Sequence, residues 1–179
     1  MGAVQNVVLV GFMGTGKTTV GQKVAKSLGY QFVDTDALVE EVEGRSIPDI
    51  FAQEGEEGFR GKETEVLQRA LQQDHAVIST GGGAVLRKEN RKLIQEGGFC
   101  VWLTASAEDI LERVMMNTNR PLLQTKDPLE TIQRMLSERH DFYVETADLI
   151  LETTELHPDD VAYGICESAR VYFQHRVGE

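Results

Sequence analysis

A glycine-rich segment close to the N-terminus has the residue types needed to bind phosphate groups. Residues 11–18 read GFMGTGKT, which matches the pattern GxxxxGKT, and they stand between an apolar run and a helical pattern. Glycines allow backbone N–H groups to point at phosphates, and the N-terminus of the following helix adds a partial positive charge. We expect Lys17 to contact the β- and γ-phosphates of a nucleoside triphosphate, and the Thr18 hydroxyl to bind Mg²⁺. A glycine-rich turn without a ligand is the alternative, which the flanking patterns disfavour.

Two carboxylates follow the second apolar run and could assist phosphoryl transfer. Asp34 and Asp36 are separated by one residue, and a right-handed crossover would bring both next to the phosphate-binding loop. One carboxylate could hold metal-bound water while the other accepts a proton from an acceptor hydroxyl. Aspartate is also a common N-cap, so capping of the following helix is the alternative role.

The end of the third apolar run argues against a switch GTPase or a motor ATPase. Such proteins place an aspartate for the metal there, whereas residues 75–79 lead into Thr80 and three glycines. The guanine-reading pattern NKxD is also absent, so adenine is the expected base. Three consecutive glycines are costly to order, and close approach of a ligand to residues 81–83 would explain them. A flexible turn is the alternative.

Arginine side chains near the expected loops could bind an anionic second substrate. Guanidinium groups pair with carboxylates through two parallel hydrogen bonds, and Arg60, Arg120 and Arg139 are candidates for this role. Taken alone, each of them fits a solvated surface arginine better. Arg120 precedes a proline in a polar segment that could close over ATP and bring positive charge to the transferred phosphoryl group.

The alternation of short apolar runs with helical patterns predicts the elements that position these residues. A parallel sheet covered by helices on both faces is typical of this alternation. Five strands are expected, over residues 7–10, 31–34, 75–79, 99–103 and 148–151. Gly29 is expected to end the first helix, Ser106 and Asp109 to form a capping box, and Pro158 to begin the last helix.

The charge balance excludes some classes of partner. Eighteen lysines and arginines against 29 acidic residues give a net charge of −11, which repels nucleic acids and anionic membrane surfaces. No apolar run is long enough to span a membrane, and no leader precedes the first strand, so a cytoplasmic protein is expected. Cys100 and Cys166 lie in apolar patterns, which fits a reducing compartment without disulfides. The length of 179 residues predicts one domain over 1–179.

Taken together, these residues resemble the shikimate kinase family, whose members use ATP to phosphorylate the 3-hydroxyl of shikimate in chorismate and aromatic amino-acid biosynthesis. The resemblance spans nearly the whole chain and depends on the order and spacing of several motifs. Besides the phosphate loop, these are DTD (34–36), GRSI (44–47), GE (55–56), FRGKE (59–63), TGGG (80–83), RPLL (120–123), and Arg139 with Tyr143, Glu145 and Ala147. The resemblance implies an α/β three-layer P-loop kinase fold, with a five-stranded parallel sheet and helices on both faces.

The resemblance also implies roles for individual residues. Thr18 and Asp34 would hold Mg²⁺, and Lys17, Asp36 and Arg120 would take part in catalysis. ATP would contact Gly14, Thr15, Gly16, Lys17, Thr18, Thr19, Arg113 and Arg120. Shikimate would contact Asp36, Arg60, Glu63, Gly82, Gly83 and Arg139, with the two arginines of this set on its carboxylate. A substrate-binding segment would cover residues 34–61, and a lid residues 115–127.

Two other functions remain open from the sequence. A related small-molecule kinase such as a gluconate kinase shares the phosphate loop but lacks a carboxylate clamp at the positions of Arg60 and Arg139. A regulatory module that binds nucleotide without turnover is the second alternative. Four residues suited to phosphoryl transfer argue against it: Lys17, Asp34, Asp36 and Arg120. The chain is expected to act as a monomer. Leu156 departs from the family, because some members place a basic residue against the adenine there.

Overall fold

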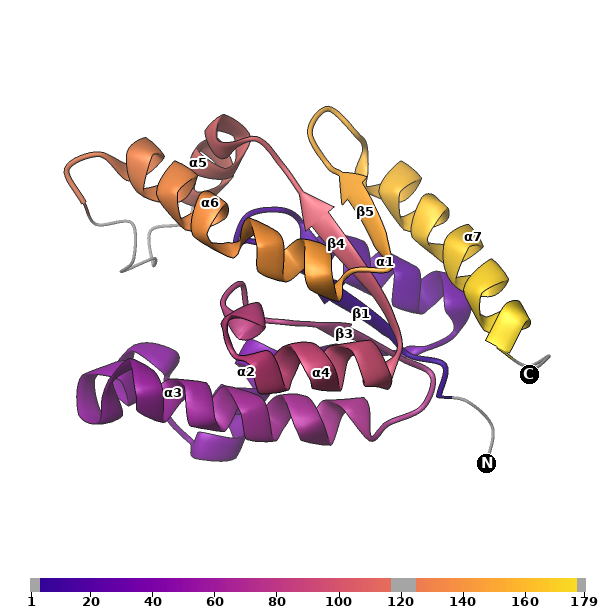
Figure 1. The fold of residues 1–179 in the computed structure, drawn as a ribbon, viewed down its shortest axis with the longest axis horizontal. Coiled ribbons are helices and arrows are strands. Elements are labelled where there is room, and N and C mark those ends of the chain that lie inside the picture. The colour runs from indigo at the N-terminus through magenta and orange to yellow at the C-terminus, as the bar shows by residue number, and fades with distance from the viewer. Residues whose placement is uncertain (1–3, 117–124, 177–179) are drawn as a thin grey trace.

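A five-stranded parallel sheet runs through the centre of the computed structural model, which describes residues 4–116 and 125–176 (Figure 1). Its strands follow the order β2-β3-β1-β4-β5. Their bounds are β1 Val7–Val10, β2 Gln31–Asp34, β3 Ala76–Ser79, β4 Phe99–Thr104 and β5 Leu149–Glu152. All five expected strands are therefore present. The third begins one residue late because His75 has a positive φ of 59°, which extended strands do not adopt.

Alternate residues of β1 face opposite sides of the sheet, and each side has its own apolar core. Val7 and Leu9 pack with residues of α1 (Lys17–Leu28) and α7 (Pro158–Arg176). Val8 and Val10 pack on the other side with residues of α3 (Ile47–Leu71), α4 (Lys88–Gly97) and α6 (Pro128–Thr146). Helices thus cover both faces, as Figure 1 shows, and the three-layer fold expected from the sequence is confirmed.

The expected helix ends are largely present. Gly29 ends α1 in the left-handed conformation, with φ 71°, and Pro158 begins α7. Helix α5 (Ala107–Met115) begins after Ser106, whose Oγ accepts a hydrogen bond from the backbone N–H of Asp109. The reciprocal half of the predicted capping box is not formed, because the Ser106 N–H donates to Thr154 Oγ1 instead.

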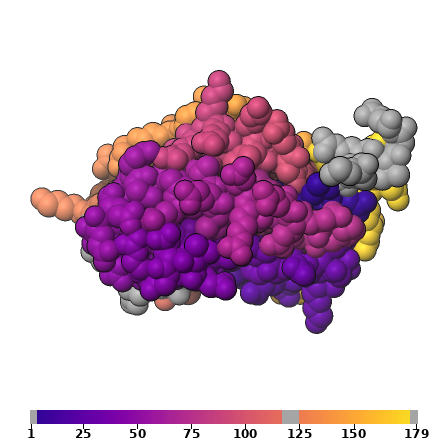
Figure 2. Space-filling view, turned by 90° about the horizontal axis from the view of Figure 1, so that it is seen from below, coloured from indigo at the N-terminus to yellow at the C-terminus, as the bar shows by residue number. Residues whose placement is uncertain are grey.

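The expected substrate-binding segment, residues 34–61, is mostly helical and forms one end of the molecule (Figure 2). It comprises α2 (Thr35–Glu43) and the first part of α3, which breaks at Gly55, where φ is 72° and ψ is −175°. Four buried side chains join these helices in a small separate core: Val39, Ile50, Phe59 and Val66. The segment is therefore a packed helical unit that follows β2 directly and continues into the second part of α3.

The expected lid, residues 115–127, lies mostly outside the described residues, as does Arg120. At its two ends, Met115 and Met116 are exposed, and Asp127 caps α6 by accepting a hydrogen bond from the N–H of Glu130. Among the residues that the structure describes, no helix combines the length and the apolar character needed to cross a membrane.

Candidate active site

The loop between β1 and α1 requires glycine at three positions. Gly11, Gly14 and Gly16 have φ values of 145°, 76° and 93°, which residues with a side chain rarely adopt. A Cβ atom on Gly11 would also lie 2.4 Å from the carbonyl oxygen of Leu103 in β4. Because Gly16 is the N-cap of α1 and offers no side-chain cap, the first N–H groups of the helix can bind an anion.

Lys17 reaches back over this loop. Its Nζ donates to the carbonyl oxygens of Gly11, at 2.6 Å, and Phe12, at 2.8 Å, and the side chain is buried. Thr15 closes the loop from within, since its Oγ1 donates to the same Phe12 oxygen. The ammonium group is thus held inside the turn that the glycines create, where it adds to the positive potential of the helix N-terminus.

Asp34 joins the loop to the substrate-binding segment. Its Oδ1 accepts hydrogen bonds from the backbone N–H groups of Asp36 and Ala37 and caps α2. Its Oδ2 lies 3.3 Å from the hydroxyl Oγ1 of Thr18 on α1. The capping role considered for this pair of aspartates is thus real for Asp34, and the same carboxylate also faces Thr18.

Gly81 is flanked by two carboxylates that the family resemblance assigns to the binding of shikimate. A Cβ atom at this glycine would lie 2.8 Å from Asp36 Oδ1 and 2.7 Å from Glu63 Oε1. A Cβ atom at Gly83 would lie 2.4 Å from Arg60 Nη2. Side chains thus lie close to Gly81 and Gly83, and a Cβ atom on Gly82 would lie 3.2 Å from the backbone nitrogen of Met13. The approach of a ligand to these glycines stays a prediction.

Arg60 and Glu63 form a buried ion pair on α3. Arg60 Nη1 lies 2.8 Å from Glu63 Oε2, and the Glu63 side chain is only 1% exposed. Burial raises the pKa of the Glu63 carboxyl above its ordinary value, although the guanidinium groups of Arg60, Arg139 and Arg87 oppose this shift. Arg60 Nε and Glu63 Oε1 are also buried and have no hydrogen-bond partner among the described residues. Each of these two atoms therefore has unused hydrogen-bonding capacity beside the ion pair.

Arg139 lies against Phe12 of the phosphate loop and close enough to Glu63 to affect its pKa. It is buried on α6, and its guanidinium carbon lies 5.3 Å from the ring centroid of Phe12. One helical turn later, Tyr143 donates from its hydroxyl to the carbonyl oxygen of Gly82 at 2.6 Å. Burial raises the pKa of Tyr143 to about 12, and the nearby Arg139 opposes this shift. Tyr143 therefore stays a neutral hydrogen-bond donor that fixes the glycine segment.

Arg113 holds the outer side of the loop. Its Nη1 donates to the Gly14 carbonyl oxygen at 3.1 Å, and its Nη2 donates to the carbonyl oxygen of Thr153 at 3.3 Å. The arginine thereby connects the loop to the residue that follows β5. Its expected contact with adenine stays a prediction, as do the phosphate contacts of Gly14, Thr15, Gly16 and the exposed Thr19.

Two further arginines near the site were not predicted from the sequence. Arg91 on α4 lies 3.1 Å through Nε from Glu145 and donates from Nη1 to the Val85 carbonyl oxygen at 2.8 Å. Arg87 precedes α4 and pairs with Glu57 on α3. Both acidic partners are distant in the sequence, so no local pattern identifies these pairs.

Comparison with known proteins relates this site to a known family. The sequence profile of shikimate kinase matches residues 13–170 of the chain. The chain belongs to the shikimate kinase family. The shikimate kinase of Symbiobacterium thermophilum is 48% identical over 164 residues, which cover 90% of this chain and 94% of that protein. The shikimate kinase of Marinomonas sp. is 40% identical, with 96% of both chains covered.

Solved structures agree with this membership. Shikimate kinase from Acinetobacter baumannii, solved in complex with shikimate, superposes with a TM-score of 0.90 at 38% identity and 94% coverage of both chains. A gluconokinase from Sinorhizobium meliloti reaches a TM-score of 0.54 at 18% identity, covering 99% of this chain and 96% of its own. That second likeness concerns the fold alone. The family resemblance is thus confirmed, and a gluconate kinase is not favoured.

Proposed function

We propose that this chain transfers the γ-phosphoryl group of ATP to the 3-hydroxyl of shikimate, giving shikimate 3-phosphate and ADP. The observation that carries the proposal is the position of residues 81–83 between the two halves of the site. Asp36 and Glu63 flank Gly81, while a Cβ atom on Gly82 would lie 3.2 Å from the backbone nitrogen of Met13 in the phosphate loop. Acceptor-side carboxylates and the nucleotide loop thus meet at one short segment.

The nucleotide half of the proposal rests on the loop and on one pair of oxygen ligands. Backbone N–H groups of residues 14–19 would bind the phosphates, and Lys17 would balance charge on the β- and γ-phosphates. Thr18 Oγ1 and Asp34 Oδ2 are hard oxygen donors 3.3 Å apart, which is a donor set that suits Mg²⁺ bound to phosphates. When bound, Mg²⁺ would neutralise the charge that develops between the β- and γ-phosphate oxygens.

The acceptor half of the proposal rests on buried charge. Arg60 and Arg139 would bind the carboxylate of shikimate, and Glu63 would fix the orientation of Arg60. The 3-hydroxyl oxygen of shikimate would form a bond to the γ-phosphorus, and Asp36 would accept the proton of that hydroxyl. The bond between the γ-phosphorus and the bridging β-phosphate oxygen would break, which releases ADP. Arg120 would add positive charge to the transferred group, as the family resemblance implies.

A coupled assay of ADP release tests this function. The protein is mixed with ATP and Mg²⁺ in three reactions, which contain shikimate, gluconate or no acceptor. The proposal expects rapid ADP release with shikimate only. Release with gluconate would favour the related kinase, and equal, negligible release in all three reactions would favour a regulatory module.

A further inference from the structure

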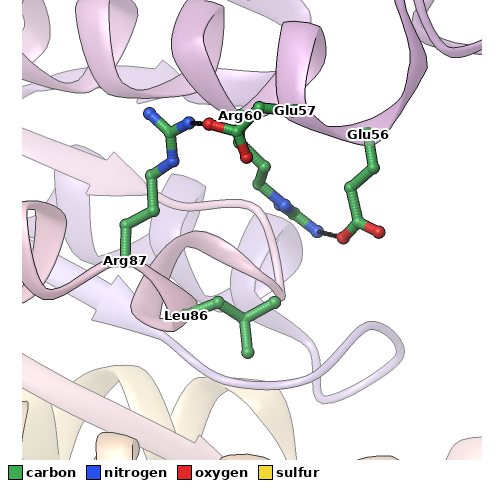
Figure 3. Close-up of a pocket in the computed structure, with 5 residues that line it drawn as sticks. All are labelled: Glu56, Glu57, Arg60, Leu86 and Arg87. Atoms are coloured by element: carbon green, nitrogen blue, oxygen red, sulfur yellow. Dashed lines mark hydrogen bonds and ion pairs between the residues drawn. The ribbon is translucent and has the colours of Figure 1, made fainter.

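A charged pocket adjoins the proposed acceptor site. Its volume is about 390 Å³, and it is lined by Glu56, Glu57, Arg60, Leu86 and Arg87 (Figure 3). Clefts of about 300–1,000 Å³ commonly hold small ligands. Arg60 belongs to both sites, since its Nη1 pairs with the buried Glu63 and its Nη2 lies 3.4 Å from Glu56 at the pocket. The pocket therefore shares Arg60 with the proposed carboxylate clamp.

Arg87 and Arg60 are held in the same manner. Each guanidinium has a buried anchor on α3, which is Glu63 for Arg60 and the Thr64 hydroxyl for Arg87, at 3.4 Å from Nη1. Each also pairs with an exposed glutamate, and the two dashed contacts in Figure 3 mark these pairs. The Arg87 side chain is 26% exposed, whereas its partner Glu57 is 88% exposed.

The exposed glutamates can be exchanged for another carboxylate. Ion pairs with solvent-exposed acids contribute little, because water solvates the released carboxylate almost as well. A ligand carboxylate that enters the pocket would be partly removed from water and would pair more strongly with the same guanidinium. The charge of Arg87 is also felt inside the site, since it opposes the raised pKa of Glu63.

Because the chain has a net charge of −11, an anionic substrate needs a local positive surface at the pocket entrance. We propose that Arg87 is a further carboxylate-binding residue for shikimate, and that Glu57 occupies it until the substrate carboxylate displaces that side chain. The inference rests on the proposed function, and it adds a third guanidinium on the outer side of Arg60. Its role is specificity for an acid-bearing acceptor.

The alternative is that the Arg87–Glu57 pair only ties α3 to the start of α4. Two variants, Arg87→Met and Glu57→Gln, break this same pair from opposite sides. If the pair has only this structural role, both variants should change the KM for shikimate in the same direction. Carboxylate exchange predicts opposite directions, because one variant removes the binding group and the other removes its competitor.

The experiment measures the steady-state kinetics of the unmodified protein and of each variant. We expect Arg87→Met to raise the KM for shikimate by about tenfold, as for loss of a charged hydrogen bond, and Glu57→Gln to lower it by about twofold. In both variants kcat and the KM for ATP should stay within about twofold of the original values. Arg87→Lys should raise the KM for shikimate less than Arg87→Met does. The lysine keeps the positive charge but lacks the planar group that pairs with a carboxylate through two hydrogen bonds.

Arg69→Met is the matched control, since it removes an exposed arginine near the far end of α3 and should leave all constants unchanged. Parallel changes in the Arg87→Met and Glu57→Gln variants, or no change in either, would overturn the inference. If Arg87→Met does not fold, the comparison of Arg87→Lys with Glu57→Gln decides by the same criterion. Failure of the proposed function is distinct, because the unmodified protein would then release no ADP in response to shikimate.

Discussion

Thr18 on α1 donates a hydrogen bond to Asp34 at the end of β2, with 3.3 Å between Oγ1 and Oδ2. The second oxygen of the same carboxylate caps α2. One side chain thus connects the phosphate loop to the helix that carries Asp36. A movement of Asp34 would therefore affect both the proposed metal ligands and the proposed base.

Asp34→Asn should raise the Mg²⁺ concentration needed for half-maximal activity by about tenfold or more, because a neutral amide is a weaker ligand than a carboxylate. The amide oxygen can still cap α2, so the melting temperature should change little. Activity is measured as a function of Mg²⁺ concentration. Asp74→Asn, an exposed aspartate that accepts from the Gln5 N–H, serves as the charge-matched control. Identical Mg²⁺ dependence in both variants would refute the proposed ligand role.

Lys17→Ala should reduce kcat by about 10³-fold or more, because the charge held within the phosphate loop is lost. The exposed Lys26 on the same helix provides the control, and Lys26→Ala should retain full activity. Thermal unfolding of both variants shows whether α1 is intact. A folded Lys17→Ala protein with normal kcat would contradict the role of this residue.

Gly83→Ala tests the approach of Arg60 to the backbone. The added methyl group would displace the end of a flexible side chain, so the melting temperature should hold while the KM for shikimate rises by about tenfold. Gly98→Ala is a useful contrast, because its methyl group would lie 2.3 Å from the backbone oxygen of Asn6. That variant should lose about 1–3 kcal/mol of stability and keep its KM. If Gly83→Ala and Gly98→Ala changed stability by the same amount and changed the KM for shikimate by the same factor, the result would argue against the clamp.

Glu63→Gln should separate stability from binding. Because burial raises the folded-state pKa of Glu63 above its ordinary value of 4.5, the folded state binds this proton more tightly than the unfolded state. The contribution of Glu63 to stability is therefore largest below about pH 4.5 and is lost as the pH rises through the raised pKa.

Glutamine does not ionise, so the Gln variant does not lose stability as the pH rises from about 4.5 through the raised pKa of Glu63. Over this pH range the free energy of unfolding of the variant should increase relative to that of the original protein. Its KM for shikimate should nevertheless rise, because Arg60 loses its ionised partner. Chemical denaturation at several pH values measures the first effect, and kinetics the second. A stability difference that is independent of pH would show that the Glu63 pKa is not raised.

Arg139→Ala should raise the KM for shikimate by about tenfold to a hundredfold, with a far smaller effect on the KM for ATP, because the removed charge is assigned to the carboxylate. Tyr143, one turn away, keeps the glycine segment in place through its bond to Gly82. Initial rates with each substrate varied in turn give both constants. Equal increases in the two constants would remove Arg139 from the clamp.

Local patterns in the sequence were sufficient for the fold and for the phosphate loop. The strand bounds and the end of α1 at Gly29 depend on neighbouring residues, and the structure matches them closely. The break of α3 at Gly55 was not predicted, since a single glycine inside a helical pattern is usually tolerated.

The contacts of the site depend on residues distant in the sequence, and these were harder to predict. The glycines at 81–83 indicated close approach of a ligand, but only the structure shows that Asp36, Glu63 and Arg60 lie beside them. The pairing of Arg87 with Glu57 joins residues 30 positions apart on two elements whose packing no local pattern encodes. The sequence offered Arg60, Arg120 and Arg139 as candidates for anion binding, and the family resemblance assigned Arg60 and Arg139 to the shikimate carboxylate.

The most direct measurement is phosphorus NMR of the product formed from ATP and shikimate, because it reports which oxygen received the phosphoryl group. The account predicts one phosphate monoester resonance with scalar coupling to the proton on carbon 3 of shikimate, in an amount equal to the ADP formed. Inorganic phosphate as the only new species, or coupling to the proton on carbon 4 or 5, would contradict it.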